Sequence, residues 1–82
     1  MVRRRRGPLE IAAQLLQLAI EPRKKADLMY EARLDFRGLQ RNLRYLNDMG
    51  LLENTGSWFR TTQKGSEFLR RYGEMAKMLV EG

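Results

Sequence analysis

The chain has 82 residues, no cysteine and no histidine, and its 16 Lys and Arg against 10 Asp and Glu give a formal net charge of +6. This length fits one small domain, and the missing residue types exclude disulfides, thiolate or imidazole metal sites and histidine-based catalysis. No metal, cofactor or enzymatic activity is therefore expected, and a basic chain of this kind is expected to bind a polyanion.

The first segment, residues 1–7, carries four consecutive arginines from Arg3 to Arg6 and only two apolar residues, Met1 and Val2. Such a run predicts a flexible basic arm. Two interpretations stay open. The arm is either a solubilising tail or cloning remnant, or a segment that contacts phosphates or a nucleic-acid minor groove.

A first helix is predicted from Pro8 to Ile20, with Gly7 as its N-cap and Pro22 beyond its end. Its apolar residues recur at helical spacing and predict a core-facing stripe, formed by Ile11, Ala12, Leu15, Leu16 and Ala19. This stretch is shorter than the roughly 18 apolar residues that a membrane span needs. We therefore expect no membrane segment and a cytoplasmic protein.

A second helix is predicted from Lys25 to Ala32, directly after Arg23 and Lys24, with Leu28 and Met29 as core candidates. Cations are disfavoured at a helix N-terminus, so the basic run is explained if a phosphate binds there. The alternative is that the run belongs to an exposed loop. The next two residues, 33 and 34, are predicted to form a tight connection.

A third helix is predicted to begin after the N-cap residue Asp35 and to stop at Gly50. Leu39, Leu43 and Leu46 repeat at i, i+4 and i+7 and predict its buried face. Its polar face carries Arg37, Gln40, Arg41 and Arg44, with Asn47 further along.

Two short runs, Leu51–Asn54 and Trp58–Thr61, follow this helix and are separated by residues 55–57, Thr-Gly-Ser. Their composition and the glycine turn predict a β-hairpin. Alternation along the second run places Phe59 with the core and Trp58 on the opposite face with Arg60. Trp58 then either covers the edge of the core, which is the more common fate of a lone tryptophan, or lies against a nucleic-acid backbone.

Thr62 is predicted to cap a last helix over residues 63–81. Phe68 and Leu69 are assigned to the body of the domain. The apolar positions beyond them continue a heptad-like seam and are expected to pair with the same helix of a second copy. This predicted dimer interface consists of Tyr72, Met75, Ala76, Leu79 and Val80. The alternative is that the first helix of the same chain covers these residues.

Three short helices, a hairpin and a longer closing helix, in this order, are the elements of a winged helix-turn-helix. We therefore predict a mainly α fold with a small β-hairpin and an extended C-terminal helix. The expected organisation is a basic arm (1–7), the winged helix-turn-helix (8–69) and a distal dimerisation segment (70–82). The third helix of such a fold enters the DNA major groove, where arginine matches guanine and glutamine matches adenine.

The predicted function is non-enzymatic binding of double-stranded DNA by a homodimer, sequence-specific or sequence-tolerant, in a transcriptional regulator or a nucleoid-associated, chromosome-organising protein. The expected DNA contacts are Arg37, Gln40, Arg41 and Arg44 on the third helix and Lys24, Lys25, Ser57, Trp58 and Arg60 at the backbone and wing. The alternative interpretation of the three arginines on the third helix is that they form a solvent-exposed helix face with no binding role. The alternative function is a winged-helix protein-interaction module in a larger assembly, and RNA binding is a lesser one.

Several stretches also carry a family resemblance, namely residues 24–30 (KKADLMY), 34–39, 43–46 (LRYL), 49–52 (MGLL), 59–65 (FRTTQKG) and 67–69. From about Glu10 to the C-terminus the chain resembles archaeal winged-helix regulators and chromatin-type proteins, nearest to the small dimeric 10a group. The resemblance implies DNA binding without catalysis and antiparallel pairing of the last helices. Two residues depart from the family pattern: Asp35, whose carboxylate would repel phosphate, and Gln63, where an acidic residue is usual.

Overall fold

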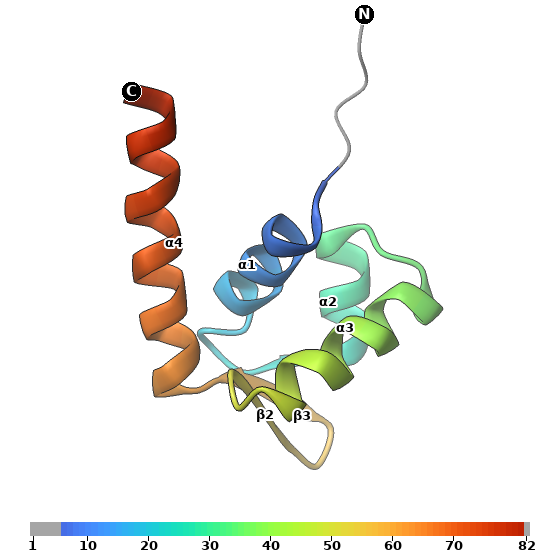
Figure 1. Cartoon of the computed structure of the whole chain (residues 1–82). Helices are drawn as coiled ribbons and strands as arrows, with labels where there is room; N and C mark the ends of the chain where they lie inside the picture. The colour runs from blue at the N-terminus through green and yellow to red at the C-terminus, as the bar shows by residue number, and fades with distance from the viewer. Residues whose placement is uncertain (1–5, 82) are drawn as a thin grey trace, which may run out of the picture.

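The structure, a computed structural model, describes residues 6–81, with side chains up to Leu79. In chain order the elements are α1 (Pro8–Leu18), β1 (Arg23–Lys24), α2 (Lys25–Ala32), α3 (Phe36–Asp48), β2 (Leu52–Thr55), β3 (Trp58–Thr61) and α4 (Gln63–Glu81) (Figure 1). This arrangement confirms the predicted winged helix-turn-helix with an extended C-terminal helix. Residues 1–5 of the predicted basic arm lie outside the described residues.

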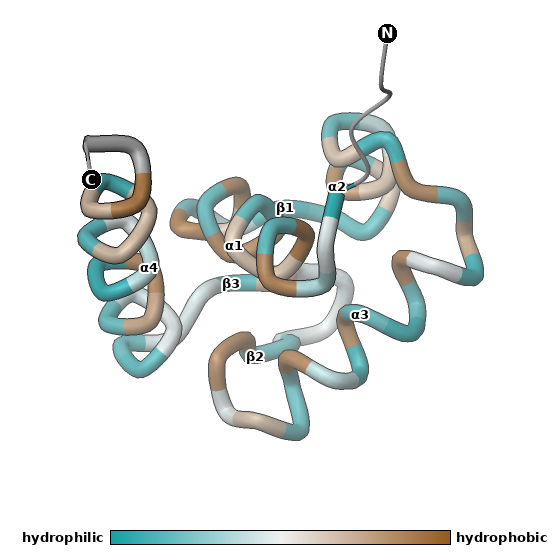
Figure 2. Tube along the Cα trace, turned by 45° about the horizontal axis from the view of Figure 1, so that its top comes forward, coloured by the Kyte–Doolittle hydropathy of each residue, from teal (hydrophilic) through white to brown (hydrophobic). Residues whose placement is uncertain are grey.

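Leucines form most of the core. The largest of the fully buried side chains are six leucines, namely Leu15, Leu16, Leu28, Leu39, Leu46 and Leu52. In Figures 1 and 2, α1 lies between α4 on one side and α2 and α3 on the other. Phe68 and Leu69 pack partly against this cluster, as predicted, and thereby attach the first half of α4 to the body.

The first helix ends at Leu18, two residues before the predicted end at Ile20. Strand β3 explains the early end, because it takes the carbonyl groups of the last turn. The backbone N–H of Thr61 donates to the Ala19 carbonyl at 2.8 Å, and the Thr61 hydroxyl donates to the Leu16 carbonyl at 2.6 Å. These contacts replace the hydrogen bonds that a longer helix would make.

The wing is a three-stranded antiparallel sheet in the order β1-β3-β2, rather than the predicted two-stranded hairpin. The added strand, β1, pairs Arg23 with Phe59 and Lys24 with Trp58. The next strand begins at Leu52, one residue later than predicted, because the N–H of Leu51 still donates to the Leu46 carbonyl at the end of α3. The same strand ends at Thr55, one residue beyond the predicted end at Asn54, so the turn shortens to residues 56 and 57.

Both ends of α3 are closed by hydrogen bonds. The Asp35 carboxylate accepts from the backbone N–H of Gly38 at 2.6 Å, which confirms Asp35 as the N-cap. At the other end Gly50 has φ +77° and follows the C-cap, so that Leu51 can bond back to Leu46 as in a Schellman motif. The predicted stop at Gly50 is therefore confirmed.

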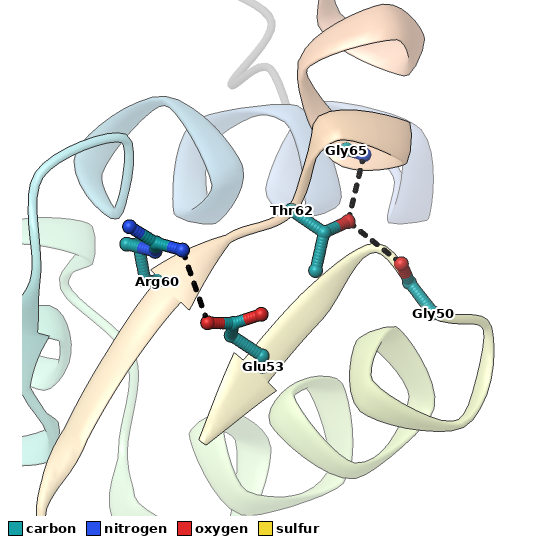
Figure 3. A network of polar contacts seen from close by, with 5 residues as sticks. All are labelled: Gly50, Glu53, Arg60, Thr62 and Gly65. Atoms are coloured by element: carbon teal, nitrogen blue, oxygen red, sulfur yellow. Dashed lines mark hydrogen bonds and ion pairs between the residues drawn. The ribbon is translucent and has the colours of Figure 1, made fainter. Parts of the chain in front are cut away.

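The start of α4 holds the end of α3 in place. The Thr62 hydroxyl donates to the Gly50 carbonyl at 2.7 Å and accepts from the N–H of Gly65 at 3.1 Å (Figure 3). The Lys64 ammonium donates to the Met49 carbonyl at 2.9 Å, where a cation is favoured by the helix dipole. Thr62 thus caps α4, as predicted, and also joins it to α3.

Gly65 is required by this close approach. A Cβ atom at residue 65 would collide with the Leu51 carbonyl oxygen and lie 2.6 Å from Thr61 Cγ2. We expect Gly65→Ala to lower the free energy of unfolding by about 1–3 kcal/mol, measured by urea denaturation, because the gain in helix propensity does not offset the displaced backbone. The matched control is Gly73→Ala on the same helix, where a Cβ meets nothing within 4 Å. That variant should gain roughly 0.5–1 kcal/mol, and a similar gain in Gly65→Ala would contradict the close approach.

Candidate functional site

The outer face of α3 is basic and accessible. Leu39, Leu43 and Leu46 turn one side of the helix into the core, where each is at most 4% exposed. The predicted recognition residues on the opposite side, Arg37, Gln40, Arg41 and Arg44, are all exposed, as is Asp48 near the end of the same side. Among the side chains that the structure describes, none of these three arginines forms an ion pair. Their charge is therefore free to meet an anionic partner.

Lys25, the first residue of α2, reaches across to α3. Its ammonium donates to the Gln40 side-chain carbonyl at 2.5 Å and lies 5.1 Å from the centre of the Phe36 ring. The predicted contact residue Lys25 thus lies beside the basic outer face of α3. The side chain leans toward α3, so in this structure it does not extend freely from the α2 N-terminus.

A polar hollow lies between the start of α2, α3 and the inner face of the wing. Its volume is about 230 Å³, and it is lined by Lys25, Gln40, Leu43, Arg44, Asn47, Asn54 and Phe59. Two of the four predicted recognition residues therefore share this hollow with an asparagine from β2. Asn54 was not among the predicted site residues. Strand alternation predicted that Phe59 faces the core. Asn54 lies opposite Phe59 in the β2–β3 register, and this register could not be derived from the sequence.

The predicted wing residues lie on the other face of the sheet. Trp58 is 46% exposed, and the Lys24 ammonium lies 5.2 Å from the centre of its ring. Arg60 forms an ion pair with Glu53 at 3.3 Å on the neighbouring strand (Figure 3). Trp58 is not part of the core cluster, so the interpretation in which it covers the core edge is wrong. The structure groups Lys24 with Trp58 and Arg60, and it separates them from the hollow beside α3.

Asp35 departs from the expected charge pattern, yet its carboxylate has a structural role. It accepts the N–H of Gly38 and lies at the positive end of the α3 dipole. Asparagine caps a helix about as well as aspartate, so we expect Asp35→Asn to change stability by less than about 1 kcal/mol. Loss of the negative charge should raise duplex affinity by about two- to tenfold at low salt, measured by fluorescence anisotropy. Glu74→Gln, at an exposed site on α4, is the control that should leave affinity unchanged.

Beyond the body of the domain, α4 carries an incompletely covered apolar face. Tyr72 is half-buried and its ring stacks on Phe68 with centroids 6.2 Å apart, whereas Met75 and Leu79 are 51% and 80% exposed. A hollow along this face is also lined by residues 7–10 at the start of α1. The first helix of the same chain therefore covers only part of the predicted dimer interface. Ala76 is half-buried there, and the Val80 side chain lies outside the described residues.

Arg6 is bound to the folded body. Its guanidinium donates to the Ala32 carbonyl at 2.6 Å, to the Arg33 carbonyl at 3.1 Å and to the side-chain carbonyl of Gln14 at 2.7 Å. These acceptors include the end of α2, where a cation is favoured by the helix dipole. The last arginine of the basic run is thus attached at the α2–α3 turn.

Within residues 6–81, no helix has the length and apolar character that crossing a membrane requires. No group of three or more acidic, histidine or cysteine side chains in the same part is arranged to hold a metal ion.

Comparison with known proteins supports the architecture. A family model described as winged helix-turn-helix matches residues 5–80, which is nearly the whole chain. Comparison with curated proteins gave no match. Winged helix-turn-helix domains are typically non-enzymatic DNA-binding domains, so the match suggests DNA binding. With four helices, a three-stranded wing and this match, the chain belongs to the winged helix-turn-helix family.

Proposed function

We propose that the protein binds double-stranded DNA without catalysis, as a homodimer that regulates transcription or organises the chromosome in the nucleoid. The observation that carries the proposal is the row of Arg37, Arg41 and Arg44 on α3, exposed and without ion-pair partners among the described side chains. A solvated helix face is usually interspersed with acidic residues that neutralise it. The only carboxylate within α3 is Asp48.

The proposed docking places α3 in the major groove. Arg37 and Arg41 lie opposite the leucine stripe, while Gln40 and Arg44 lie toward the hollow beside the wing. Arginine forks onto the O6 and N7 atoms of guanine or pairs with phosphate, and both interactions suit this face. Lys25 would approach the same edge of the major groove from α2. Ser57 is exposed at the tip of the wing, where it would meet the neighbouring DNA backbone. Lys24, Trp58 and Arg60 would contact the backbone only on the outer side of the wing.

The experiment that tests DNA binding is a gel-shift comparison of a promoter fragment with random duplex of equal length, at several salt concentrations. Binding of both fragments with similar affinity supports an architectural protein, and strong preference for the promoter supports a regulator. Binding of neither fragment at low salt would contradict DNA binding and favour the protein-interaction module.

The homodimer is proposed from the distal half of α4. Met75 and Leu79 are exposed at heptad-like spacing, and residues 8 and 9 of α1 continue the same apolar surface. A second copy that pairs α4 with α4 would cover this surface and would place two recognition helices on two half-sites. The antiparallel arrangement of these helices, and the division of the chain at residue 70, belong to the same proposal.

The dimer is tested by changing its exposed residues. Tyr72 is half-buried within its own chain, so the sharper variant is Met75→Glu with Leu79→Glu. The wild-type chain has a mass of 9.7 kDa. We expect light scattering to report a dimer for the wild type and a monomer for the variant, because two buried carboxylates would be desolvated. Lys77→Glu, on the opposite side of α4, should remain dimeric. A monomeric wild type would contradict the proposed interface.

A further inference from the structure

Phe36, the first residue of α3, is 59% exposed and does not belong to the apolar residues that pack on the core. It lies one helical turn before Gln40 and two turns before Arg44, so the three side chains form one ridge along the helix. This ridge begins at the N-terminal end of α3, the end of a recognition helix whose residues contact base edges. An aromatic ring is thus exposed at the tip of the proposed DNA-binding surface.

Lys25 orients both neighbours on this ridge. Its ammonium lies 5.1 Å from the centre of the Phe36 ring and bonds to Gln40 Oε1. An ammonium can only donate hydrogen bonds, so the amide oxygen of Gln40 must face Lys25 and the amide N–H groups face away from it. The ridge therefore presents an apolar ring beside a hydrogen-bond donor.

This combination matches one base pair in particular. The major-groove edge of an A·T pair offers the apolar 5-methyl group of thymine beside two hydrogen-bond acceptors, thymine O4 and adenine N7. We infer that Phe36 contacts the thymine methyl group and that, with the Gln40 amide donating beside it, the protein prefers A·T pairs in the major groove. The inference rests on the proposed function and adds the base chemistry that α3 reads.

The test uses two 20-base-pair duplexes, rich in A·T pairs, that differ only in carrying thymine or uracil. Uracil lacks the methyl group but pairs in the same way, so base pairing is held constant. For the wild type we expect about fourfold weaker binding of the uracil duplex per methyl contact, and about fifteenfold if two protomers each lose one. Binding is measured by fluorescence anisotropy at one fixed salt concentration.

Phe36→Ala removes the ring and should bind both duplexes with equal affinity. Because Phe36 is exposed, this variant should keep the wild-type circular dichroism spectrum and melting temperature. The matched control is Tyr30→Ala, which removes a ring that is 84% exposed on α2 and should keep the thymine preference. Equal wild-type affinity for the two duplexes, a preference that persists in Phe36→Ala, or one that is lost in Tyr30→Ala would each overturn the inference. Failure of the wild type to bind either duplex would overturn the proposed function as well.

Discussion

Duplex affinity is expected to fall by about three to five decades as monovalent salt rises from roughly 50 to 200 mM, if the proposed homodimer neutralises about six to ten phosphates. Each protomer offers six basic residues for this purpose, Lys24, Lys25, Arg37, Arg41, Arg44 and Arg60. About three contacts per protomer would neutralise the lower number of phosphates in this range, and about five would neutralise the upper number. The free energy comes from counterions that leave the DNA, so the effect does not depend on the base sequence.

The six residues should not contribute equally. Arg60 already forms an ion pair with Glu53, and Lys24 and Lys25 lie over aromatic rings, whereas the three arginines of α3 have no ion-pair partner among the described side chains. We therefore expect a slope of log affinity against log salt nearer to −5 than to −9, within the range that about six to ten contacts allow. Anisotropy titrations at five or more salt concentrations measure this slope. A slope near zero would rule out phosphate contacts as the source of affinity.

The sequence predicted the helices well because each carries its own local signals. The leucine stripe of α3, its N-cap Asp35 and the terminating Gly50 lie within 16 consecutive residues. Strand β1 has no such signal. It consists of two basic residues after a proline, and it forms only because β3 offers an open edge to pair with. Pairing between segments more than 30 residues apart could not be inferred from spacing.

The candidate site was predictable to a similar extent. Helical spacing alone placed four polar side chains of α3 on one face, and strand alternation separated Trp58 from Phe59. The association of Lys24 with Trp58 depends on the β1–β3 register, and that of Lys25 with Phe36 depends on how α2 crosses α3. Phe36 could have been noticed, because Asp35 as N-cap places it at the first helical position, in line with Gln40.

Arg37→Ala combined with Arg41→Ala should abolish duplex binding under conditions in which the wild type is mostly bound. If both arginines contact phosphate, their loss reduces the slope of log affinity against log salt by about 1.8 per protomer. Near 0.1 M salt this corresponds to nearly a hundredfold weaker binding per protomer, and a dimer that loses these contacts in both protomers would weaken by the square of this factor. Both side chains are exposed and unpaired within the described residues, so the fold should be unaffected. Anisotropy measures the loss, and circular dichroism and light scattering check fold and dimer.

The matched control removes the same charge from another part of the molecule. Arg70→Ala with Lys77→Ala changes two exposed residues of α4, and it should weaken binding by far less than the α3 variant. An equal loss in both variants would mean that overall charge, rather than the face of α3, holds the DNA. Unchanged duplex binding in the α3 variant would contradict DNA binding by this face and would favour binding of a protein partner there.

The way in which the loss of affinity depends on duplex sequence and salt distinguishes two possible roles of an arginine, contact with phosphate and contact with guanine. Phosphate contacts weaken binding to every duplex by the same factor and lower the salt slope, because they carry no sequence information. Bidentate contacts to guanine cost about 1–3 kcal/mol only where that base is present. The N-terminal end of α3 is expected to enter the groove most deeply. Arg37 lies close to this end, whereas Arg41 lies one turn farther along the helix. We therefore expect the single variant Arg37→Ala to show the stronger dependence on duplex sequence, and Arg41→Ala the more uniform loss.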